Sequence, residues 1–172
     1  MTDNQTTASA GSIAELLAEG KPAHSTWLLQ TWEKLNDALF NGALTMPKEV
    51  DWVPNLPAEA RYYRTTNIIA LNASRYSTES LMQKHTSDQT VPTDEEFNKL
   101  RVILCLLAHE MVHQYIAQLG SGSVKHDAEF VRIANSLPRT DDCAFPNCDI
   151  ASAAHWPLAP SNAGAAAIDV SE

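Results

Sequence analysis

Residues 102–113 read VILCLLAHEMVH, an unbroken apolar run that leads into the pattern H-E-x-x-H. Such a run predicts a helix that is buried on every side. Residues four apart lie almost above one another on a helix, so His109 and His113 present their imidazoles to one point. Glu110 lies about a quarter turn away and can reach a water on a metal ion held there. The stretch therefore predicts a zinc site with one open coordination position, as in catalytic centres.

Two other interpretations apply to the same stretch. Histidines that enter an apolar core can be a purely structural pair, satisfied by hydrogen bonds, because burying an unpaired polar group costs several kcal/mol. Cys105, one turn before His109, is either an extra ligand or a small core residue, and free cysteine in an apolar run is typical of the core. We favour the metal site and a core role for Cys105, since a further histidine, His126, follows a glycine-rich break.

The remaining patterns predict helices around a small sheet. Apolar residues at helical spacing predict a helix over 24–40, which Asn41-Gly42 ends. Alternating polar and apolar residues predict a strand over 49–53, and segments rich in Tyr, Thr and Ile predict strands over 61–66 and 67–73. A capping box at Thr93–Glu96 starts the H-E-x-x-H helix, which should reach Leu119. Further helices are predicted over 12–19, 78–84 and 127–137. The fold class is therefore α+β, one domain of helices packed on a three-stranded sheet with the H-E-x-x-H helix at its core.

Composition limits the partners. The chain has 172 residues and a net charge of −9, which disfavours autonomous nucleic-acid binding. Arg61, Arg64 and Arg75 could form a local basic patch, but such spacing is more typical of solvated side chains. We expect no membrane segment, and the N-terminal residues do not resemble a secretory signal. Three cysteines, an odd count, predict no disulfide framework. These features predict a cytoplasmic protein.

The third metal ligand stays open from spacing alone. The break at Gly120-Ser121-Gly122 lets the chain turn back, so His126 can meet the metal at the start of the last helix. Glu129, within the first turn of that helix, and His155 are also within reach.

Several segments resemble the SprT-like zinc metallopeptidases, whose eukaryotic members include Spartan. They are residues 109–113, 125–130, 133–135, 32–44, 50–52 and 68–72. The resemblance implies a zincin-like domain over 23–140, with His126 as third ligand of one catalytic Zn²⁺ and Glu110 as general base. Residues 1–22 would be a flexible tail with a short helix. Residues 141–172 would be an irregular segment, either an incomplete zinc ribbon or a mobile tail.

The chain departs from the family pattern in three places. Asp127 replaces the usual glycine after the third histidine, and the glycine that often precedes the central strand is not found. Many bacterial relatives end in a four-cysteine zinc ribbon, whereas this chain offers only Cys143 and Cys148. Two thiolates cannot fill a structural tetrahedral site. His155 could add a third donor, but we favour a degenerate loop.

The predicted activity is hydrolysis of peptide bonds in protein or unfolded polypeptide substrates. The resemblance extends this to DNA-associated proteins, which the acidic charge disfavours. The alternatives are an effector or mobile-element protease with one defined target and a non-catalytic, zinc-stabilised binding module. Residues 67–73 are the candidate edge strand for the substrate, or else simply core. Tyr115, Arg132 and His155 are candidate oxyanion donors, with none preferred, and no oligomeric state is predicted.

Overall fold

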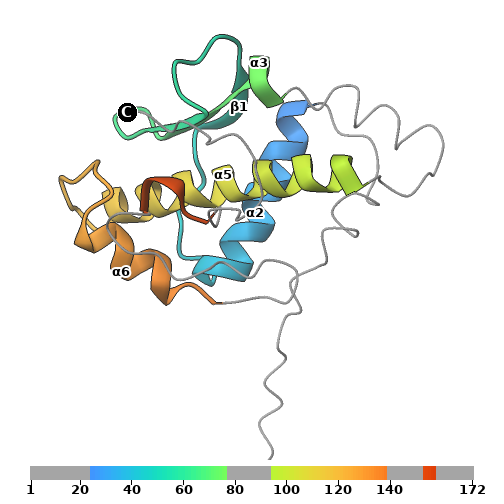
Figure 1. Ribbon diagram of the computed structural model, residues 1–172. Coiled ribbons are helices and arrows are strands. Elements are labelled where there is room, and N and C mark those ends of the chain that lie inside the picture. Colours follow the sequence, from blue (N-terminus) through green and yellow to red (C-terminus); the bar gives the residue numbers. More distant parts are fainter. Residues whose placement is uncertain (1–23, 77–93, 139–152, 158–172) are drawn as a thin grey trace, which may run out of the picture.

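The computed structural model describes residues 24–76, 94–138 and 153–157, and it has an α+β fold with a small mixed sheet. Figure 1 shows helix α5 running across the molecule below the sheet, with α6 beside its C-terminal half. The elements are α2 (His24–Phe40), β1 (Glu49–Val53), β2 (Ala60–Tyr63), β3 (Ile68–Asn72), α3 (Ala73–Tyr76), α5 (Asp94–Gln118), α6 (Ala128–Ser136) and the 3₁₀ turn η1 (Ala153–His155). The helices predicted over 12–19 and 78–84, the side chains of the capping box, and Cys143 and Cys148 lie outside the described residues.

The sheet has the strand order β1-β3-β2. Strand β3 pairs in parallel with β1 and antiparallel with β2. The prediction that residues 67–73 form an edge strand is therefore wrong, because this segment is the central strand with partners on both sides. Its burial fits this position: the four residues from Ile69 to Asn72 are all buried, without the alternation of a half-exposed strand.

Helix α5 forms the centre of the core, as the apolar run predicts. Every residue from Ile103 to Val112 is buried, including Cys105, which confirms its interpretation as a core residue. The 25 residues of α5 span about 37 Å. The predicted apolar stripe of α2 packs into the same core through Leu28, Trp32, Leu35 and Leu39. In the described part of the chain, no helix combines the length and apolarity needed to cross a membrane.

A buried glutamine ties the H-E-x-x-H helix to the rest of the fold. Gln114 is fully buried, accepts a hydrogen bond from the Trp32 indole at 3.0 Å and donates to the Thr45 carbonyl at 2.9 Å. It also donates to Asn67 Oδ1 at 3.0 Å, and the same oxygen accepts from the Tyr62 hydroxyl at 3.2 Å. Since these partners come from α2, the loop before β1 and the turn of the β2–β3 hairpin, Gln114 fixes the hairpin against α5.

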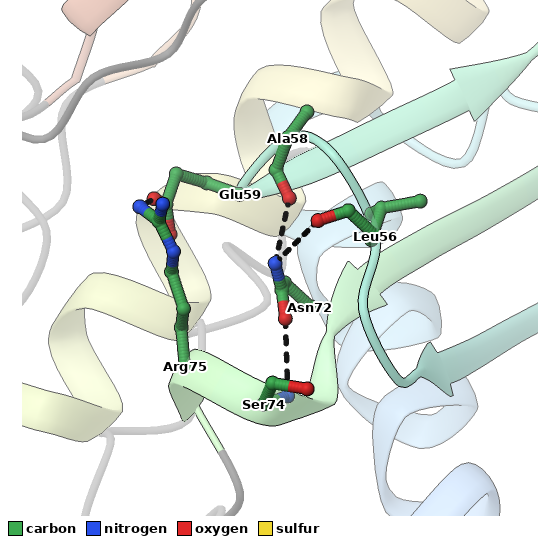
Figure 2. Close-up of polar contacts among 6 residues, drawn as sticks. All are labelled: Leu56, Ala58, Glu59, Asn72, Ser74 and Arg75. Atoms are coloured by element: carbon green, nitrogen blue, oxygen red, sulfur yellow. Dashed lines mark hydrogen bonds and ion pairs between the residues drawn. The ribbon is translucent and has the colours of Figure 1, made fainter.

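A second polar cluster holds the loop that leads into β2. Figure 2 shows the Asn72 amide group donating to the carbonyls of Leu56 at 2.7 Å and Ala58 at 3.1 Å. In the same cluster the exposed Arg75 forms an ion pair with the buried Glu59. Asn72 is itself buried, so these bonds satisfy its amide while they fix the loop to the end of β3. The cluster thus sets where the edge strand β2 begins.

Candidate metal centre

Three histidine side chains meet at one point between α5 and the start of α6. The Nε2 atoms of His109 and His126 are 2.7 Å apart, those of His113 and His126 3.1 Å, and those of His109 and His113 3.3 Å. His109 and His113 lie one turn apart on α5, while His126 comes from the loop after the Gly120–Gly122 break. The three ring planes are inclined to one another by about 60°, at 62°, 57° and 63°. The predicted convergence of these imidazoles is found in the structure.

Hydrogen bonding within the triangle cannot satisfy all three nitrogens. Each Nε2 carries either a proton or a lone pair, so at least two of the three are of the same kind. At least one edge of the triangle therefore sets two protons or two lone pairs against each other. A cation at the centre removes this conflict, because all three nitrogens can then act as donors to one ion.

The size of the triangle fits zinc. At a Zn–N distance of 2.0–2.1 Å and tetrahedral angles, the nitrogens should be about 3.3 Å apart. Two edges, 3.1 Å and 3.3 Å, are close to this value, and the His109–His126 edge must open from 2.7 Å. Among the described residues, these histidines form the single group of three ligating side chains close enough to share an ion. Three neutral imidazoles around one ion are also the donor set of known catalytic zinc sites.

The protonation states favour ligation. The His109 Nδ1 atom lies 2.8 Å from the carbonyl oxygen of Trp156, and a carbonyl can only accept a hydrogen bond. His109 Nδ1 therefore carries the proton, which leaves the lone pair on Nε2. Burial, together with the neighbouring His126, lowers the pKa of His113 to about 3, while Asp127 acts in the opposite direction. His113 is thus neutral at physiological pH and available as a ligand.

Asp127 fixes the position of His126. Its side chain caps α6 by accepting hydrogen bonds from the amides of Glu129 and Phe130, at 3.0 Å and 3.3 Å. The Ser123 hydroxyl donates to the other carboxylate oxygen at 2.5 Å. The Ser123 bond and the helix-terminal amides hold the pKa of Asp127 below its usual value. The helix start predicted at residue 127 is found in the structure, and Asp127 has a structural role there as the N-cap.

Glu110 lies beside the histidines with its carboxyl group enclosed. The residue is 5% exposed, and burial raises its pKa to about 8 in the metal-free protein. A hydrogen bond from the Tyr62 main-chain amide and the charge of Arg61 act against this shift. The carboxyl group is therefore held between α5 and the edge strand β2. A cation bound by the neighbouring histidines would favour its ionised form.

Phe130 forms the apolar floor of the centre. Its ring centroid lies 4.9 Å from that of each of the three histidines, and the residue is fully buried. The Trp156 ring packs edge-on against the Phe130 ring, with the centroids 6.3 Å apart. Such an apolar shell strengthens electrostatic interactions at the site, because little water screens them.

The other predicted candidates lie elsewhere. Glu129 is not part of the ligating group, Tyr115 packs on Phe40 with 5.6 Å between the ring centroids, and Arg132 is exposed. The His155 side chain is outside the described residues. Of the three arginines, Arg75 pairs with Glu59 and Arg61 lies near Glu110.

Sequence reasoning did not identify Tyr62, Trp156 or Gln114 as part of the site and its support. Tyr62 and Trp156 act through main-chain groups, and Gln114 has no motif of its own. The one sequence signal for Trp156 is a lone tryptophan in a segment rich in Ala, Ser and Pro.

Comparisons with known proteins identify no family. No protein-family model, curated protein or solved structure matches the chain.

Proposed function

We propose that this protein is a zinc-dependent endopeptidase with a zincin-like, SprT-like catalytic domain. The observation that carries the proposal is the convergence of the three Nε2 atoms beside the enclosed Glu110 carboxyl group. A purely structural zinc site has no use for a carboxylate at this position. The residues quoted above for the SprT-like family support the assignment, and His109, His113 and His126 would hold the ion.

When bound, zinc would lower the pKa of a water ligand towards 7 and polarise the scissile carbonyl. Glu110 accepts the proton of the attacking water and returns it to the leaving amine. The Tyr62 amide keeps the Glu110 carboxylate oriented for both transfers. The apolar floor of Phe130 excludes water from below the reacting groups.

We assign substrate alignment to β2 in place of residues 67–73. The main-chain N–H of Asn72 donates to the Glu59 carbonyl at 2.9 Å. Glu59 and every second residue after it therefore direct their main-chain N–H and C=O groups towards β3. The main-chain groups of Ala60 and Tyr62 consequently point away from β3. The Tyr62 amide already serves Glu110, and the outward carbonyls of this edge can pair with an extended substrate of varied sequence.

The decisive experiment combines metal content with hydrolysis. Wild-type protein, Glu110→Gln and the control Glu33→Gln, an exposed glutamate on α2, are assayed for zinc content and for cleavage of an unfolded model protein. We expect one zinc in all three and loss of cleavage in Glu110→Gln alone. Zinc-loaded wild type that is as inert as Glu110→Gln on many unfolded proteins would instead support a binding module.

Adding DNA to the assay separates the two protease hypotheses. DNA-stimulated cleavage of generic proteins would support action on DNA-associated substrates. Cleavage restricted to one defined protein would support an effector or mobile-element protease.

A further inference from the structure

A short segment near the end of the chain packs against the metal centre. The turn η1 and the two residues after it, here called the C-terminal strap (residues 153–157), lie against α5 and α6 (Figure 1). Ala153 and Trp156 are 0% and 3% exposed and belong to the same hydrophobic core as the H-E-x-x-H helix. The strap is thus part of the core that surrounds the histidines.

The strap contacts the metal centre in two ways. The Trp156 carbonyl accepts the hydrogen bond from His109 Nδ1 at 2.8 Å, and this bond is buried. The Trp156 ring packs edge-on against Phe130, at an interplanar angle of 85°. Phe130 in turn touches all three histidine rings. Trp156 therefore contacts both His109 and Phe130, the residue that packs against all three histidines.

These contacts have a chemical consequence. A neutral imidazole has two tautomers, and the proton must sit on Nδ1 for Nε2 to bind a metal. The carbonyl holds the proton on Nδ1 and fixes the rotation of the His109 ring. The Trp156 side chain anchors this carbonyl, because its ring is buried against Phe130. Without the Trp156 side chain, the carbonyl is no longer held in place, and the His109 imidazole can rotate and take the other tautomer.

We propose that the C-terminal strap is an integral part of the metal centre and that Trp156 is a positioning residue for His109. The inference rests on the proposed zinc site and extends it beyond the two helices that carry the ligands. Loss of the group that accepts a hydrogen bond from a metal-ligating histidine typically lowers metal affinity about 10–100-fold. The strap should therefore control how tightly zinc is held, without contributing a ligand.

The test measures zinc affinity in the full chain by competition with a chromophoric chelator. We expect Trp156→Leu to bind zinc about 10–100-fold more weakly than wild type. Trp156→Phe keeps an aromatic ring against Phe130 and should recover most of the affinity. Trp27→Leu is the matched control. It makes the same substitution at Trp27 on α2, which is 4% exposed and thus about as buried as Trp156. We expect this control to lower stability and to leave zinc affinity unchanged.

A second measurement is independent of the variants. Long-range ¹H–¹⁵N spectra of the wild-type histidines should show His109 protonated at Nδ1 with and without zinc. Equal affinity in wild type and Trp156→Leu, an equal loss in Trp27→Leu, or a His109 proton on Nε2 would each overturn the proposal. A wild-type protein that binds no zinc would refute the metal centre itself, an outcome that the affinity measurement identifies separately.

Discussion

The enclosed carboxyl group of Glu110 should make the metal-free protein lose stability as the pH rises. Burial raises the pKa of Glu110 from 4.5 to about 8 in the fold. Between these two values the folded protein binds more protons than the unfolded chain, so the free energy of unfolding falls with increasing pH. At about 1.4 kcal/mol for each pH unit, this interval corresponds to an upper limit of about 5 kcal/mol. The loss should be complete above pH 8.

Replacing Glu110 with Gln removes the ionisation and keeps the shape. We therefore expect the stability difference between metal-free Glu110→Gln and wild type to grow by up to about 4 kcal/mol between pH 5 and pH 9, in favour of Glu110→Gln. The lowered pKa of His113 affects both proteins equally below pH 6.5, so it cancels in the comparison. Urea unfolding at pH 5, 7 and 9 in the presence of a chelator measures the difference, and Glu33→Gln provides the control at an exposed position.

Added zinc gives the experiment a second arm. A cation beside Glu110 favours the carboxylate, so zinc should remove most of the pH dependence in wild type. Parallel pH profiles for metal-free wild type and Glu110→Gln would refute the reasoning, because they would mean that the carboxyl group is not enclosed between α5 and β2.

Two further predictions concern the third ligand and the buried network. His126→Ala leaves two imidazoles at the centre and should weaken zinc binding at least 100-fold in chelator competition, whereas unchanged affinity would place the third ligand elsewhere. Gln114→Leu removes the acceptor of the Trp32 indole and the donor to the Thr45 carbonyl, while Asn67 Oδ1 keeps only its bond from Tyr62. We expect it to lower the free energy of unfolding by about 3 kcal/mol, as measured with urea. A loss below about 0.5 kcal/mol would show that the network does not hold the hairpin against α5.

Local patterns were sufficient where neighbours in the sequence decide the structure. The apolar spacing of α2 and the alternation of β1 predicted both elements with the bounds that the structure has. The four-residue spacing of His109 and His113 placed both rings at one point, because the geometry of a helix is the same in every protein. The helix start predicted at residue 127 was likewise found, and it depends on local contacts because the Asp127 side chain bonds to amides only two and three residues away.

Strand order could not be read in the same way. Ile68–Asn72 was recognised as a strand, but its place in the sheet depends on pairing with β1 and β2, which its own residues do not encode. The run of buried residues in β3 was the available signal, because a central strand covered on both faces lacks alternation. Both β1 and β2 are edge strands, and β2 is the one whose Tyr62 amide bonds to Glu110.

By itself, the sequence determined which side chains can carry the chemistry: two histidines and a glutamate on one buried helix, and a third histidine after a break in the chain. Helical periodicity and helix capping predict where these side chains lie along the chain, because both depend on residues only a few positions apart. Only the tertiary structure decided that His126 completes the group, that the Tyr62 amide meets Glu110 and that the Trp156 carbonyl meets His109. Main-chain N–H and C=O groups are nearly identical at every residue, so their partners depend on how distant segments pack and leave no mark in the sequence.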